Sequence, residues 1–263
     1  MTETPAPIGA TELQDLAVKL NDLLRLRTLP FGMKLFEDLD EMNAVPRLRR
    51  PQEGRNFTTC QLVTQARVSG FTLGITVDNV MPGGNCGGVI GLNKPGDDYL
   101  SGKHMDGVWF DNREAARAHQ ETMPRVPHGR YSGLVVSPLR AGRLDPPDIV
   151  LFYATPGQMV LFINGLQWKS YRRYDFSITG ESACADSWGR ALSTRETSLS
   201  LPCYAERRYG GVADDELLIA LPPGEFARAV EGLAGLSKAG LRYPIMPYGP
   251  NMDPSEGLGV SYE

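Results

Sequence analysis

Apolar residues recur every three to four positions in several segments of the chain, which predicts amphipathic helices. The first such segment begins at Thr11, and its leucines fall on one helical face together with Ala17. Each of these helices is expected to pack its apolar face against the rest of the fold. The same periodicity predicts further helices over residues 60–70, 112–122, 155–166, 181–192 and 223–236.

Shorter segments rich in β-branched and aromatic residues predict strands between the helices. Residues 71–77, for example, alternate in the period of two that is typical of a strand. The other predicted strands cover residues 30–37, 131–138, 148–153, 174–178, 197–201 and 217–221. Strands interspersed with helices predict an α+β (mixed α/β) fold, with a mixed sheet and helices packed on its faces.

The ends of the chain differ in composition from its body. Residues 1–9 are polar and proline-containing, and they are expected to form a disordered lead. Residues 10–263 are numerous enough to bury a large core, either as a single globular domain or as two closely packed lobes. The segment from Arg242 onward is rich in Pro, Tyr and Gly and is expected to lie over that body.

Overall charge and hydropathy narrow the range of partners. The net charge is -4, so no global positive field attracts nucleic acid or anionic lipid. The N-terminus lacks the basic start and apolar stretch of a secretory signal, and the apolar stretch at 159–166 is too short to cross a bilayer. The chain is therefore expected to be cytoplasmic, with no membrane or nucleic-acid partner. Whether it forms a homo-oligomer is left open by the sequence. In that compartment cysteines stay reduced, which favours metal binding or catalysis over disulfides.

The four cysteines are the main candidates for chemistry. Cys60, Cys86, Cys184 and Cys203 are separated by 25, 97 and 18 residues, without the close pairs of zinc ribbons or ferredoxins. Each cysteine nevertheless lies at a turn or at the predicted end of an element, and thiolates are soft ligands suited to iron–sulfur clusters or zinc. Buried structural thiols are the alternative reading of the same residues.

Three glycines beside Cys86 point to the same site. Gly84, Gly87 and Gly88 belong to a turn over residues 81–88 in which four glycines and a proline occur. Such a turn lets the backbone approach a prosthetic group closely, so these glycines are candidate cofactor-binding residues.

Acid–base and anion-binding groups are fewer. His104 is the most suitable of three histidines for proton transfer, because it precedes Asp106 and Trp109 in a polar loop. Glu181 lies near Cys184 and could act as an acid or a base, and Arg207 follows Cys203 and could bind a substrate carboxylate. The alternative for Glu181 and Arg207 is a helix cap and a surface ion pair.

Five short motifs occur in the order of a known family. They are Thr58-Thr59-Cys60-Gln61, the glycine-rich turn at Cys86, Glu181 to Asp186, Leu201-Pro202-Cys203 and Arg242 to Tyr248. Together they resemble domain of unknown function 169, a bacterial and archaeal family. The resemblance implies a metal or iron–sulfur site at the four cysteines. The chain departs from the family pattern after Cys203, where Tyr204-Ala205-Glu206-Arg207 replaces the usual Asn-Gly-Asp-Arg.

The leading hypothesis is an iron–sulfur protein with one cluster, of the 4Fe–4S type, on some or all of the four cysteines. Four ligands would suit electron transfer, whereas three would leave an iron open as a Lewis acid. The nearby charged residues favour an enzyme acting on a small anionic organic substrate, either a lyase or hydratase or an oxidoreductase, over a simple redox partner. Two alternatives remain: a metal-free module that binds a small ligand, and a zinc-stabilised domain.

Overall fold

A computed structural model describes residues 8–82 and 84–247 of the chain. Most of the lead expected at residues 1–9 lies outside these residues, as does the tail beyond residue 247. No helix in the described ranges is long and apolar enough to cross a membrane.

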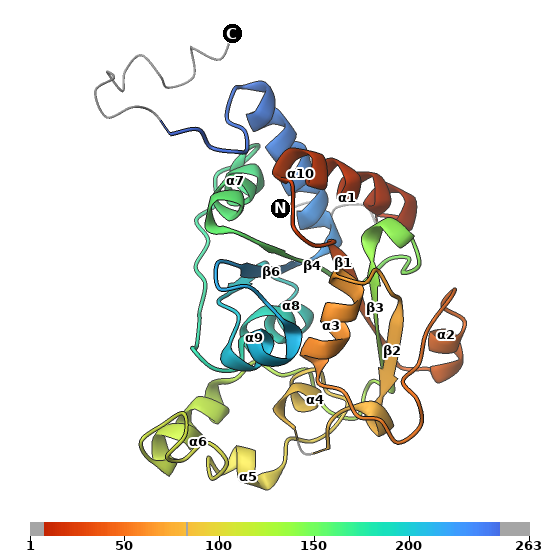
Figure 1. Cartoon of the computed structure of the whole chain (residues 1–263), viewed down its shortest axis with the longest axis vertical. Coiled ribbons are helices and arrows are strands. Elements are labelled where there is room, and N and C mark those ends of the chain that lie inside the picture. The colour runs from red at the N-terminus through yellow and green to blue at the C-terminus, as the bar shows by residue number, and fades with distance from the viewer. Residues whose placement is uncertain (1–7, 83, 248–263) are drawn as a thin grey trace.

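A six-stranded sheet in the order β2-β3-β1-β4-β6-β5 forms the centre of the fold (Figure 1). Every pairing between neighbouring strands is antiparallel. The α+β class with helices on the sheet is confirmed, but the sheet is not mixed in strand direction. The strands are β1 Phe31–Phe36, β2 Leu73–Thr76, β3 Gly133–Pro138, β4 Ile149–Ala154, β5 Ser198–Ser200 and β6 Leu217–Leu221.

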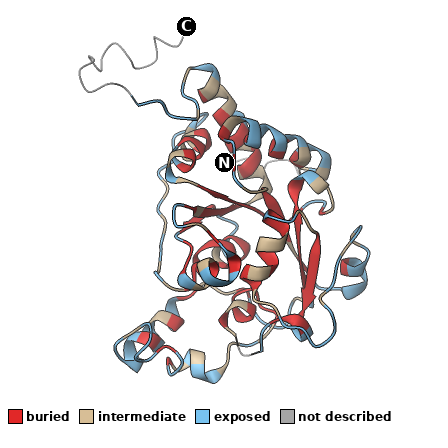
Figure 2. Ribbon diagram, viewed as in Figure 1, coloured by how far each residue is buried: buried red, intermediate tan, exposed pale blue. Residues whose placement is uncertain are grey.

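Both faces of the sheet are buried, as the ribbon coloured by burial shows (Figure 2). Alternate residues of β4 belong to different cores, because successive strand side chains point to opposite faces. Val150 and Phe152 pack in one core, and Leu151 and Tyr153 pack in the other. A strand buried on both faces is apolar along its whole length, which explains why the sequence of β4 reads as a continuous apolar run.

Three helices cover one face of the sheet (Figure 1). The backbones of two of them approach very closely where Gly165 faces Gly232. A Cβ added to Gly232 would lie only 2.1 Å from the Gly165 carbonyl oxygen. Only glycine permits this backbone contact between helices. The three helices are α1 Ala10–Leu24, α7 Pro156–Gln167 and α10 Pro223–Lys238.

Shorter helices lie on the opposite face and below it (Figure 1). This layer contains α3 Thr59–Arg67, α4 Asn85–Val89, the π-helical turn η3 Ala185–Gly189, α8 Arg190–Thr194 and α9 Tyr204–Gly210. Further out are α5 Asp97–Leu100 and α6 Arg113–Thr122, and α2 Leu39–Asn43 lies beside the edge of the sheet. Two 3₁₀ turns, Val77–Asn79 and Leu139–Ala141, follow β2 and β3.

Three predicted elements differ from the structure. The strand predicted at residues 174–178 is wrong, because this segment has no sheet partner and packs Tyr174 and Phe176 against the core beside α10. Arg228 on α10 donates to the Tyr174 hydroxyl at 3.0 Å. The helix predicted at residues 181–192 contains the π-helical turn η3, and the predicted turn at 81–88 includes the start of α4.

Candidate functional site

All four cysteines line a single cavity of about 360 Å³. Each one lies at the beginning of a helix, which the sequence predicted for Cys60 and Cys184, whereas Cys86 was expected in a turn and Cys203 at the end of a strand. Cys60 and Cys86 are the second residues of α3 and α4, Cys184 immediately precedes η3, and Cys203 precedes α9. The fold therefore brings together four cysteines from four segments that are distant in sequence.

Local capping fixes two of these helix starts. Thr58 Oγ1 accepts the Gln61 backbone N–H at 3.2 Å, and Gln61 Oε1 accepts the Thr58 backbone N–H at 3.0 Å. This capping box defines where α3 begins and hence where Cys60 lies. At α9 the Glu206 carboxylate accepts the Cys203 backbone N–H at 3.4 Å.

Cys86 interacts with two of the other cysteines, Cys60 and Cys184. The Cys184 and Cys60 thiols donate to the Cys86 sulfur, and these contacts lower the pKa of Cys86 well below its ordinary value. The contact with Cys86, followed by burial, raises the pKa of both Cys60 and Cys184. Of these three cysteines, Cys86 is therefore the one whose thiolate form is favoured by its neighbours.

Backbone amides also point at the sulfurs. The Thr59 N–H donates to the Cys86 sulfur, and the N–H groups of Glu206 and Ala183 donate to the Cys203 sulfur. Burial and the nearby Glu206 charge outweigh these two donors and raise the pKa of the Cys203 thiol to about 11. Hydrogen bonds from the backbone to cysteine sulfurs are one of the means by which proteins tune bound iron–sulfur clusters.

The described ranges contain no group of three or more His, Cys, Asp or Glu side chains arranged to hold a single metal ion. The four cysteines share the lining of one cavity. In a cubane cluster each thiolate binds a different iron atom, so the ligands of a cluster surround a larger volume than those of one zinc ion.

The three predicted glycines have different surroundings. Gly84 and Gly87 line the cavity, whereas Gly88 does not. A Cβ on Gly88 would lie 2.4 Å from Pro95 Cγ, and one on Gly87 would lie 2.4 Å from Asn93 Oδ1. Gly87 and Gly88 are therefore required for close packing of α4 against the following loop, whatever the cavity holds.

Two of the three predicted polar residues reach the cavity. His104 and Glu181 both line it, and the His104 ring lies 4.3 Å from the ring of Tyr99, another lining residue. Burial raises the pKa of Glu181, and the Ser182 hydroxyl donates to its carboxylate. Ser182 holds a left-handed φ of 60°, a conformation that costs free energy in a residue other than glycine.

Arg207 is not part of the cavity. Its guanidinium turns to the following loop, where it donates to the Ala213 carbonyl at 2.6 Å and lies 3.5 Å from the Asp214 carboxylate. None of the described residues that line the cavity is Lys or Arg. Any anion in this cavity would therefore need a different positive partner.

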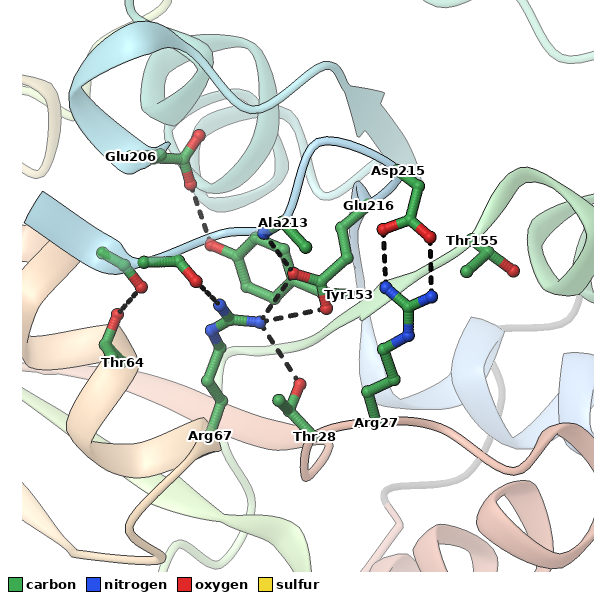
Figure 3. Close-up of polar contacts among 12 residues, drawn as sticks. Arg27, Thr28, Thr64, Arg67, Tyr153, Thr155, Glu206, Ala213, Asp215 and Glu216 are labelled. Carbon is green, nitrogen blue, oxygen red and sulfur yellow. Dashed lines mark hydrogen bonds and ion pairs between the residues drawn. The ribbon is translucent and has the colours of Figure 1, made fainter. Parts of the chain in front are cut away.

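A buried carboxylate beside the cavity is the main residue that sequence reasoning did not single out. Glu206 is fully buried and accepts a hydrogen bond from the Tyr153 hydroxyl at 2.8 Å (Figure 3). Burial raises its pKa to about 7, and the Cys86 charge adds to this effect. In the sequence, Glu206 could be noticed only because it lies three residues after Cys203, in the first turn of a helix. The sequence does not reveal that this turn is buried.

Glu206 belongs to a buried polar network with Tyr153, Arg67 and Glu216 (Figure 3). The Tyr153 ring lies 4.2 Å from the Arg67 guanidinium, and Arg67 pairs with Glu216 at 3.3 Å. Arg67 and Glu216 are both buried. This buried polar layer links α3 to α9, because Arg67 also donates to the Gly211 carbonyl at the end of α9 at 3.2 Å.

A positive charge also lies near Cys184. Arg125 is partly buried, and it donates to Gln120 Oε1 at 2.7 Å and to the Gln120 carbonyl at 2.8 Å. Burial lowers the pKa of Arg125, and the charge of Cys184 acts in the opposite direction. This guanidinium is placed to offset negative charge on the sulfurs.

The fold and the site define the class of the protein. It is an α+β protein in which four cysteines at helix starts line one cavity. The chain belongs to the family DUF169, described as Uncharacterised ArCR, which matches residues 19–232. Among its relatives is the Uncharacterized protein MJ0308 of Methanocaldococcus jannaschii, 24% identical over 230 residues that cover 86% of this chain and 95% of the relative. The family resemblance seen in the motifs is thereby confirmed. No solved structure matches the chain.

Proposed function

We propose that the protein binds one iron–sulfur cluster, of the 4Fe–4S type, through some or all of Cys60, Cys86, Cys184 and Cys203. The observation that carries this proposal is that the four cysteines line one cavity although they come from four separate segments. Buried structural thiols have no physical reason to gather in this way, since each could fill its own gap in the core.

The surroundings of the sulfurs suit such a cluster. The donor set is soft, and three backbone amides donate to two of the sulfurs. Arg125 supplies a positive charge beside Cys184. A cluster with thiolate ligands carries net negative charge, so these donors and this cation would stabilise it.

The hydrogen bonds of the sulfurs distinguish three of the cysteines from the fourth. Cys86 interacts with both Cys60 and Cys184, whereas the Cys203 sulfur accepts hydrogen bonds from the Glu206 and Ala183 amides. With three ligands, a cluster would supply an open iron that acts as a Lewis acid on a hydroxyl or carboxylate.

An enzyme is the form of the proposal that the cavity favours over a simple redox carrier. His104 and Glu181 line the same cavity, and burial raises the pKa of Glu181, so this carboxyl keeps its proton to a higher pH than an exposed glutamate does. The expected reaction is that of a lyase or hydratase, or of an oxidoreductase, on a small organic anion. In this scheme His104 and Glu181 hold and move protons at the substrate.

Anaerobic purification followed by analysis of iron, acid-labile sulfide and zinc tests the proposal. The expected result is a coloured protein with about four iron and four sulfide per chain. Changing Cys60, Cys86 or Cys184 to Ser should remove most of the cluster. His104→Gln is the matched control, because it changes a side chain of the same cavity without removing a sulfur ligand.

Two other outcomes would replace the proposal. Colourless protein with one zinc per chain would identify a zinc-stabilised domain. Protein that lacks iron, sulfide and zinc after anaerobic reconstitution would identify a metal-free binding module. Cys203→Ser separates the two cluster types, because a cluster with three ligands should survive this change and one with four should not.

A further inference from the structure

A basic segment runs along the free edge of the sheet beside β2. The backbone of Arg49 pairs with β2 at Leu73 and hydrogen-bonds to the two residues that flank it. The Arg49 N–H donates to the Thr72 carbonyl, and the Arg49 carbonyl accepts the Gly74 N–H, each at 2.9 Å. At the other end the Phe57 N–H donates to the Asn79 carbonyl at 2.8 Å. The segment between these hydrogen bonds is therefore a loop that is fixed at both ends, although its side chains are largely exposed.

This loop forms one wall of a groove of about 420 Å³. The lining of the groove includes four large apolar residues, Phe57, Leu62, Phe71 and Leu73. It also includes three arginines, Arg49, Arg50 and Arg55. The volume falls within the range of small-molecule sites, and the combination of an apolar surface with a few charged groups is typical of them.

The arginines of the groove are partly positioned in advance. The Arg49 guanidinium lies 3.8 Å from the centre of the Phe71 ring, so the aromatic face holds it in place. Arg50 Nη1 donates to Asn43 Oδ1 at 3.0 Å. An arginine that is already ordered loses less side-chain entropy when an anion binds.

The positive charge of the groove is not neutralised by the protein. Among the described residues no Asp or Glu lines the groove, and none pairs with Arg49, Arg50 or Arg55. Glu53 lies in the same loop but is exposed and does not line the groove.

A neighbouring arginine adds to this charge. Burial and the charges of Arg47 and Arg49 lower the pKa of Arg143. The region therefore carries a local excess of positive charge in a chain whose net charge is -4.

We propose that this groove binds a phosphorylated small molecule with a flat apolar body, of the chemical class of a nucleotide. Its phosphates would accept hydrogen bonds from Arg49, Arg50 and Arg55, and its apolar body would lie against Phe57 and Leu62. Several arginines favour a ligand with more than one negative charge, and their planar fork matches phosphate oxygens. The apolar residues of the groove favour an organic phosphate over a free inorganic ion.

Titration calorimetry with ADP, adenosine and inorganic pyrophosphate tests the groove at low salt. ADP is expected to bind, pyrophosphate to bind about tenfold more weakly, and adenosine not to bind measurably. Arg49→Gln and Arg55→Gln should each weaken ADP binding by about tenfold, because each removes one charge-assisted contact. Arg173→Gln is the matched control, since Arg173 is an exposed arginine outside the groove.

Three outcomes would overturn the proposal. The first is unchanged ADP binding in Arg49→Gln and Arg55→Gln, and the second is equal loss in Arg173→Gln. The third is binding of single-stranded RNA whose affinity rises with length while ADP does not bind, which would identify a nucleic-acid surface.

The groove does not depend on the cysteines. ADP binding is therefore expected to persist in Cys184→Ser, whose residue lies in the cavity and not in the groove. If the groove does not bind ADP, the iron and sulfide content of the protein is not affected. If the protein holds no cluster, ADP binding to the groove is not affected. The two proposals thus fail separately.

Discussion

Two neighbouring ion pairs differ sharply in burial, and this difference predicts how much each stabilises the fold (Figure 3). Arg67 and Glu216 are 2% and 4% exposed and lie 3.3 Å apart. Arg27 and Asp215 are both 52% exposed, yet they are closer, at 2.5 Å. We expect burial to matter more than distance, because water competes for the exposed charges and not for the buried ones.

Replacing Arg67 by Ala should cost about 3–5 kcal/mol of unfolding free energy, because it leaves the Glu216 carboxylate buried without its cation. The change also removes hydrogen bonds to the Gly211 carbonyl at 3.2 Å and the Thr28 hydroxyl at 3.3 Å. The contact with the Tyr153 ring at 4.2 Å is lost as well.

A double variant tests the cause of that loss. Arg67→Met with Glu216→Leu removes both charges and fills the space with apolar atoms, so much of the stability should return. Full recovery is not expected, because Glu216 also accepts the Ala213 N–H at 2.9 Å, a hydrogen bond worth about 1 kcal/mol. Recovery in the double variant would show that the unpaired charge, and not the lost volume, is the main cost.

Urea unfolding followed by circular dichroism measures these differences on metal-free protein under reducing conditions. Arg27→Ala is the matched control, and its effect should be a small fraction of that of Arg67→Ala. The reasoning would be refuted if Arg27→Ala were as destabilising as Arg67→Ala, or if Arg67→Ala cost less than about 1 kcal/mol.

Two further predictions concern a buried carboxylate and a helix contact. Between the ordinary glutamate pKa of 4.5 and the value of about 7 for Glu206, the folded protein holds a proton that the unfolded chain has lost, so stability falls as pH rises. Over this range Glu206 accounts for about 3 kcal/mol, and Glu206→Gln should flatten the measured dependence by that amount. Gly232→Ala should cost about 3 kcal/mol in urea unfolding, because its Cβ would lie 2.1 Å from the Gly165 carbonyl oxygen. Gly157→Ala, with no atom within 4 Å of its Cβ, should be neutral or stabilise by up to about 1 kcal/mol, and the opposite order would contradict the packing argument.

The regular elements were largely predictable, because their burial follows a simple period. Residues 10–24 carry leucines on one face and form α1, and the apolar run after Asp148 forms β4. The segment 174–178 misled the prediction because its alternating aromatics pack on a helix and not in a sheet. Strand order and direction were beyond reach, since β1 pairs with β3 and β4 through contacts about 100 residues apart.

The candidate site was predictable in its cysteines and less so in its charges. All four cysteines were placed at element ends from local signals, and those ends do meet at one cavity. Arg207 and Glu206 show the limit of such signals. They are neighbours in α9, yet Arg207 turns outward to Asp214 while Glu206 is buried against Tyr153. A helix turns by about 100° per residue, so adjacent residues face different environments that only tertiary packing determines.

The motif Thr58-Thr59-Cys60-Gln61 can now be explained residue by residue. Thr58 and Gln61 form the capping box that starts α3. Thr59 donates its N–H to the Cys86 sulfur, and Cys60 contributes a thiol to the cavity. Half of the motif is therefore structural, and it has a functional consequence because the cap fixes the position of both groups that reach the sulfurs.

The same helix start links the two proposed sites. Phe57, the residue before the cap, lines both the cysteine cavity and the arginine groove, and Leu62 in the first turn of α3 lines the groove. The backbone of Phe57 is held by Asn79 through a 2.8 Å hydrogen bond, so this shared wall is anchored to the chain that leads into α4 and Cys86. Because one short anchored segment shapes both cavities, a substitution that loosens the cap at Thr58 should disturb both, whereas substitutions of single cysteines or arginines should disturb only one.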